Sequence, residues 1–176
     1  YSYQTIPASV LQTMQQYIPS LITLKDTKKK PNNNFKFDIQ LDNAEFFKKM
    51  FFVPLDVRMA ASLKGYVNDS NGLLRVEGSF PDFIYNNTHY ESATLLCENP
   101  SEHFDCKLRG SMLMNSGAMI TLSVDAQAEE DRLKTTINWG NNTDVTYGGK
   151  LAAVARFSKT KGRSPILQTD IDILPT

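Results

Sequence analysis

The chain has 176 residues, of which 41% are hydrophobic and 22% charged, and its nineteen Lys and Arg balance nineteen Asp and Glu. This length predicts one domain, and the apolar fraction suffices for a core of ordinary size. The zero net charge argues against a nucleic-acid binder and a polybasic membrane-surface module, because both need a basic excess. The sequence starts at Tyr1 without a basic and apolar leader, so we expect a segment of a longer protein.

The first predicted element is a helix between Pro7 and Pro19. Apolar residues recur there at the spacing of one buried helical face, and proline suits a first helical turn. Residues 25–34 are rich in Lys and Asn, so we interpret them as a solvated connector that completes a first unit, residues 1–34. The predicted buried helical face consists of Val10, Leu11, Met14, Tyr17, Ile18 and Leu21.

In the second unit, residues 35–176, apolar and polar side chains alternate. Alternation is typical of antiparallel strands with one dry and one solvated face. Short turns such as Asn86-Asn87 separate the runs, which favours pairing of strands adjacent in sequence. We therefore predict a mainly β fold: a long, curved antiparallel meander sheet, taco-like or sandwich-like, of about eight or nine strands with one N-terminal helix. Clear alternating runs lie at 35–41, 57–64, 120–127, 133–139 and 167–173.

Residues 43–52 interrupt the alternation between the first strands. Asn43 suits a helix N-cap, and Phe47, Met50 and Phe51 would then share one face of a short amphipathic helix. Such a helix either closes one end of the sheet or grips a lipid or a partner. Both interpretations stay open from the sequence.

The motifs of common catalytic sites are missing from the sequence, including the nucleophile elbow, the zinc-protease helix and the dinucleotide fingerprint. Gly148-Gly149-Lys150 lacks the spacing of a phosphate loop, and we interpret it as a bulge in a long strand. Asp170 and Asp172 fall on a wet strand face, where neither carboxylate is desolvated as acid–base catalysis requires. We therefore predict a non-enzymatic protein without a cofactor.

His89, Cys97, His103 and Cys106 provide four soft metal ligands within a short stretch. Their spacing matches no zinc module, so a metal site is the least favoured interpretation. The two cysteines are either free buried thiols or, if their strands are neighbours, a disulfide. The sequence leaves this choice open.

Several segments recur in a characteristic order along residues 35–176. A strand at 35–43 leads to the L-x-G-x-x-N pattern at 63–68, then to an apolar segment at 81–87 that ends in Tyr and Asn, and later to 133–141. This order resembles the AsmA-like proteins, and most closely the TamB-type translocation and assembly module branch. The N-terminal helical stretch lies outside the resemblance.

The resemblance implies an internal segment of a large cell-envelope protein of Gram-negative bacteria, anchored in the inner membrane and extending through the periplasm as an apolar β-groove. Such a groove carries phospholipid between the inner and outer membranes or assists outer-membrane protein assembly. The implied partners are phospholipid acyl chains, neighbouring segments of the same polypeptide and outer-membrane assembly proteins, with no nucleic acid. Each implied lining residue is equally consistent with plain core. These residues are Phe37, Ile39, Val57, Met59, Leu63, Leu74, Val76, Ile120, Leu122, Val124 and Ile137.

A binding module of another class is the alternative: a secreted β-sandwich that binds carbohydrate or mediates adhesion. Three glycosylation sequons, starting at Asn68, Asn86 and Asn141, are consistent with secretion, although Asn-rich turns also create them by chance. Trp139 and Tyr147 would form the sugar-stacking platform of such a module. The direction in which these two rings point distinguishes the two hypotheses.

Overall fold

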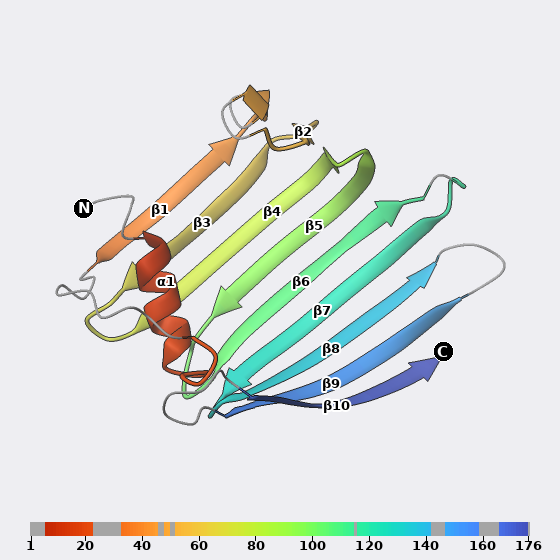
Figure 1. Cartoon of the computed structure of the whole chain (residues 1–176). Helices are drawn as coiled ribbons and strands as arrows, with labels where there is room; N and C mark the ends of the chain where they lie inside the picture. The colour runs from red at the N-terminus through yellow and green to blue at the C-terminus, as the bar shows by residue number, and fades with distance from the viewer. Residues whose placement is uncertain are drawn as a thin grey trace.

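The computed structural model describes residues 6–22, 33–45, 48–49, 52–114, 116–141, 147–158 and 166–175 (Figure 1). Among the elements that can be described, helix α1 (Ile6–Gln15) precedes ten strands. The strands are β1 (Asn34–Leu41), β2 (Leu55–Val57), β3 (Ala61–Asn68), β4 (Leu73–Tyr85), β5 (Thr88–Glu98), β6 (Phe104–Leu113), β7 (Met119–Glu129), β8 (Arg132–Asn141), β9 (Gly148–Ser158) and β10 (Ile166–Pro175).

All ten strands belong to one antiparallel sheet in the order β1-β3-β4-β5-β6-β7-β8-β9-β10, with β2 paired to β4 beyond the end of β3. The sheet is curved and does not close on itself (Figure 1). The predicted class, a mainly β meander with one N-terminal helix, is therefore confirmed. Because β2 and β3 pair with the same side of β4, they act as one strand with a break at residues 58–60.

An irregular band crosses the middle of the sheet at this break. The backbone N–H groups of Arg58 and Met59 both donate to the Asp82 carbonyl, so two residues oppose one, as in a β-bulge. The pairing of β5 with β6 is also irregular, because its register shifts by one residue between Glu91 and Thr94. Ser92, inside this shift, has a φ of 52°, a left-handed backbone that some bulges contain and that is uncommon for a residue other than glycine.

The bulges keep apolar side chains on one face where the alternation of the sequence changes phase. On the apolar side of β4, the residues are even-numbered from Leu74 to Phe80 and odd-numbered at Phe83 and Tyr85. The two rings nevertheless lie on the same face, with centroids 6.2 Å apart, and Phe83 stacks on Tyr90 of β5 at 5.1 Å. A regular strand would have turned Phe83 to the solvated face.

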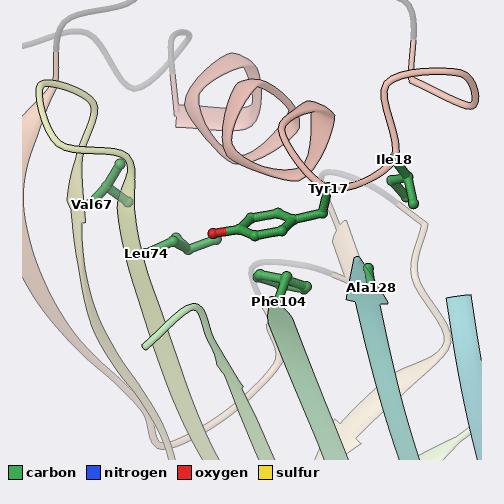
Figure 2. Close-up of a cluster of buried hydrophobic side chains, with 6 residues drawn as sticks. All are labelled: Tyr17, Ile18, Val67, Leu74, Phe104 and Ala128. Atoms are coloured by element: carbon green, nitrogen blue, oxygen red, sulfur yellow. The ribbon is translucent and has the colours of Figure 1, made fainter. Parts of the chain in front are cut away.

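The core lies at one end of the sheet, where the N-terminal segment crosses the ends of the strands (Figure 2). The ring of Tyr17 packs on Phe104 with centroids 6.1 Å apart, while Val10 and Met14 of α1 pack around the cluster. The predicted helical face is wrong in part, because Leu11 and Leu21 are exposed: only one side of a short segment can reach the sheet rim. The buried cluster consists of Tyr17, Ile18, Val67, Leu74, Phe104 and Ala128.

Polar side chains from two hairpin turns fasten this segment to the rim. Asn99 is buried and donates to the Tyr17 hydroxyl at 2.9 Å, while its carbonyl oxygen accepts from the Leu74 backbone N–H at 2.7 Å. Asp131 accepts hydrogen bonds from the backbone N–H and the hydroxyl of Ser20 at 2.7 and 2.9 Å. The segment that follows α1 is therefore held in place by hydrogen bonds as well as by apolar packing.

Most of the predicted connector, residues 25–32, lies outside the described residues. Asn33 is not solvated as predicted: it is buried, and its backbone N–H donates to Asp69 at 2.7 Å. Asn34 already belongs to β1. Ser9 of α1 also donates to Asp69, at 2.8 Å, so the end of the connector is tied to the helix and to the turn after β3.

Within the predicted helix at 43–52, Phe47, Met50 and Phe51 lie outside the described residues. The Lys48 backbone N–H donates to the Ala44 carbonyl at 2.9 Å, which is one helical turn. Phe52 is 89% exposed, with a φ of 52°. Its two proposed roles, closing one end of the sheet or binding a lipid or a partner, stay predictions.

Candidate functional site: an open apolar sheet face

The strand registers place ten of the eleven predicted lining residues on one face of the sheet, which we call the apolar face. Residues paired across neighbouring strands point to the same side, so the face can be followed from strand to strand. Met59 lies outside this set, in the break between β2 and β3. One transverse row runs through nine strands: Ile39, Leu63, Gly78, Leu95, Leu108, Val124, Ile137, Leu151 and Ile173.

Four apolar members of this row were missing from the predicted lining residues: Leu95, Leu108, Leu151 and Ile173. In β6 the signal is present: Phe104, Cys106, Leu108, Gly110 and Met112 occupy every second position. It is weak because cysteine and glycine contribute little to a hydrophobic pattern. Counting them as apolar would have found Leu108.

Away from α1 the apolar face is uncovered by the described residues. Leu108 and Leu122, in the middle of the sheet, are 39% and 40% exposed, and Ile173 in the last strand is 64% exposed. Side chains in the interior of a two-layer sandwich would be shielded by the opposite sheet. Among the residues described there is one layer of sheet and no second sheet.

Two aromatic rings on the apolar face lie flat over glycines of the neighbouring strand. A Cβ atom at Gly149 would collide with the ring of Trp139, and one at Gly65 would collide with the ring of Phe37. Gly148 and Gly149 pair regularly with β8, so the predicted bulge at this point is wrong. These glycines provide room for a close approach, as glycine in a strand often does.

Cys97 and Cys106 are directly opposed on β5 and β6 and form a disulfide. This selects one of the alternatives that the sequence left open. The disulfide lies on the apolar face beside the buried cluster. The structure does not bring the four soft ligands together, because His89 contacts Asp82 at 2.8 Å and His103 contacts Asp105 at 3.0 Å.

The opposite side of the sheet, the polar face, carries charged ladders. Arg109 donates to both carboxylate oxygens of Asp125 at 2.7 and 2.9 Å. A hydrogen bond from Arg75 to Glu77, together with the charge of Glu98, raises the pKa of Arg75 above its ordinary value. Asp170, one of the two carboxylates considered for catalysis, pairs with Arg156 and is exposed.

Four hollows of about 360 to 520 Å³ are lined mainly by polar-face side chains. Two of them share Arg109 and follow a line of hydroxyl and amide groups. That line crosses the sheet through directly paired positions, so it forms a shallow transverse trough. The residues along it are Ser62, Ser79, Thr94, Arg109, Ser123 and Asn138.

In the part of the chain that the structure describes, no group of three or more His, Cys, Asp or Glu is arranged to hold a metal ion. The described helical residues also form no helix long and apolar enough to cross a bilayer. Comparison of the chain with protein-family models, curated proteins and solved structures finds no match.

Proposed function

We propose that the apolar face binds phospholipid acyl chains and that the chain is a lipid-groove segment of an AsmA/TamB-like protein of the cell envelope. The observation that carries the proposal is a sheet whose apolar face continues across nine strands and which the described residues form as a single layer and cover at one end only. An apolar surface of this kind needs no specific residue to hold an acyl chain, because each buried methylene contributes about 0.8 kcal/mol.

Two further features support this assignment. The Cys97–Cys106 disulfide is consistent with an oxidising compartment such as the periplasm. The outer sides of β1 and β10 have no partner strand among the described residues, which leaves backbone groups available for neighbouring segments of the same polypeptide. Under this proposal the groove carries phospholipid between the inner and outer membranes, or assists outer-membrane protein assembly.

The single tryptophan provides a direct test, because Trp139 lies on the apolar face next to Leu122. A fatty acid brominated on its acyl chain, added as monomers below its micelle concentration, should quench the emission of Trp139. The Leu122→Asp variant places a charge where the chain would lie. It should weaken quenching about tenfold or more, since burying the new carboxylate costs several kcal/mol.

A matched control is Thr94→Asp, which introduces the same group at an exposed position of the polar face and should leave quenching unchanged. Circular dichroism verifies that both variants fold. Lipid extraction and native mass spectrometry of the purified protein should detect bound phospholipid. Equal quenching in the two variants, or no quenching of the wild type, would refute acyl-chain binding at this face.

The trough on the polar face favours a second candidate function, which is carbohydrate binding. The hydroxyl and amide side chains of the trough would bind the sugar, with Arg109 at the centre of the trough. Against an aromatic sugar platform, the ring of Trp139 is packed over Gly149 instead of standing free. Titration with neutral and uronic-acid oligosaccharides tests this candidate. Binding that Arg109→Ala abolishes and Leu122→Asp preserves would favour it over the lipid groove.

A further inference from the structure

The Cys97–Cys106 disulfide joins the two strands that hold the side chain of Tyr17. Asn99, which follows β5, donates to the Tyr17 hydroxyl at 2.9 Å, and Phe104, which begins β6, packs on the Tyr17 ring with centroids 6.1 Å apart. Figure 2 shows the two rings next to each other at the strand ends. These two partners of Tyr17 therefore lie in the loop that the disulfide closes, one on each side of the turn.

Like charges oppose the pairing of β5 with β6 at this end of the hairpin. Next to the disulfide, the last residue pair before the turn is Glu98 with Asp105. Two carboxylates directly opposite each other on neighbouring strands destabilise the pairing. Arg75 of β4 pairs with Glu98, and His103 contacts Asp105 at 3.0 Å, but neither contact joins β5 to β6. The covalent bond is therefore the main link that keeps the two strand ends together.

We infer that this disulfide is a redox switch: a dithiol reductant opens it, the hairpin end loosens, and the N-terminal segment, residues 6–22, leaves the end of the apolar face. The inference rests on the proposed lipid-binding function and adds regulation to it. Release of the segment would uncover apolar side chains that are at most 8% exposed, which lengthens the apolar face toward the strand ends. These side chains are Val67, Leu74, Phe104 and Ala128.

The reductant can reach the sulfur atoms, because both cysteines are partly exposed on the apolar face. One thiolate of the dithiol attacks a sulfur of the disulfide and forms a mixed disulfide, and the second thiol of the reductant then displaces the protein sulfur. Two electrons and two protons pass to the protein, which ends with two thiols. The reductant ends as a disulfide, so the step is balanced.

The fastenings that remain after reduction are weaker. At the neighbouring turn, Asp131 accepts hydrogen bonds from the backbone N–H and the hydroxyl of Ser20 at 2.7 and 2.9 Å. Such bonds contribute little net free energy where water can replace them. The ring contact of Tyr17 depends on the position of Phe104, which the disulfide fixes relative to β5.

Amide hydrogen exchange of the full chain, followed by mass spectrometry with and without dithiothreitol, tests the switch. Reduction should speed exchange about tenfold in peptides from residues 10–22, because this segment then opens locally, while peptides from β8 and β9 keep their rates. Cys97→Ala, Cys106→Ala should exchange at the reduced rate in both conditions.

Two single variants test the link through the loop. Asn99→Ala removes the contact with Tyr17 while the disulfide stays intact, so it should speed exchange of the segment without dithiothreitol. The matched control is Glu102→Ala, an exposed residue of the same loop, which should behave like the wild type. Equal exchange of the wild type in both conditions would overturn the switch. Equal acceleration in every strand would also overturn it, because reduction would then only lower the global stability.

Quenching of Trp139 by the monomeric brominated fatty acid tests the regulation of the acyl-chain site. Cys97→Ala, Cys106→Ala should reach half-maximal quenching at about threefold lower fatty-acid concentration, since more apolar surface is accessible. An unchanged concentration would overturn the regulation. Because the exchange measurement contains no lipid, its failure overturns the switch alone, whereas absence of quenching in the wild type overturns the acyl-chain site.

Discussion

Asn99 holds the N-terminal segment to the sheet through one buried amide group. Its N–H donates to the Tyr17 hydroxyl and to the Gly72 carbonyl, and its oxygen accepts from the Leu74 backbone. A side chain with both a donor and an acceptor is needed here, and Asn provides both in a short length. The sequence alone places this residue only in a turn before Pro100.

Asn99→Ala should lower the free energy of unfolding by about 2–3 kcal/mol, because a buried backbone N–H and the Tyr17 hydroxyl would lose their partner. Urea unfolding followed by circular dichroism measures this change. Glu102→Ala, an exposed residue of the same turn, is the control and should stay close to the wild type. Similar stabilities for the two variants would show that water replaces the amide at no cost.

At the scale of elements, the β5–β6 hairpin is stabilised by a cross-strand disulfide close to its turn. The two cysteines are nine residues apart in sequence, and the pairing of their strands brings them face to face. A bridge over a short loop restricts the unfolded chain, which gives about 2–3 kcal/mol in the chain-entropy model. Phe104 of the same hairpin also contacts the ring of Tyr17, so the hairpin supports the N-terminal segment.

The double variant Cys97→Ala, Cys106→Ala should therefore unfold at a lower urea concentration, with a loss of about 2–3 kcal/mol. Wild-type protein measured in a reducing agent should lose a similar amount, which serves as the internal control. The double variant itself should not respond to the reducing agent. An unchanged midpoint in both experiments would mean that the hairpin is already fixed by its strand pairing.

At the scale of the whole molecule, the surface area is large for the mass. The chain exposes 12016 Å² at 19.8 kDa, whereas a compact monomer of this mass exposes about 8,600 Å² by the usual scaling. The single layer contributes to this excess, because the described strands expose both faces of the sheet over much of their area. Apolar side chains of the middle strands therefore remain half-exposed.

This architecture predicts a small heat-capacity change of unfolding. An ordinary domain of 176 residues would give about 2.1–2.6 kcal/mol/K, and we expect this protein to fall below about 2 kcal/mol/K, since less apolar surface is buried on folding. Differential scanning calorimetry measures the change, and sedimentation velocity verifies that the sample is monomeric. A monomer with an ordinary value would contradict an uncovered apolar face.

The alternation in β1, β7 and β8 was enough to predict the sheet and most of its apolar face, because side-chain direction in a regular strand depends on position alone. The same rule fails at Phe80 and Phe83, where a bulge lets two residues of opposite parity share a face. Pro81 between them is the available signal, since proline in the interior of a strand marks an irregularity.

The candidate site was predictable as a list of residues and not as an open or closed surface. Leu108 and Leu122 have the same pattern whether a second sheet covers them or not, and their exposure is known only from the packing.

The sequence by itself determined the β class, the N-terminal helix and the separation of apolar from polar side chains, because these depend on local spacing. The tertiary structure decided that the described strands form one layer, that Cys97 bonds to Cys106 and that the described N-terminal segment covers one end of the sheet. The single layer and the position of the N-terminal segment depend on contacts between residues far apart in sequence. The disulfide depends on the register of its hairpin, which a single alternating pattern does not specify.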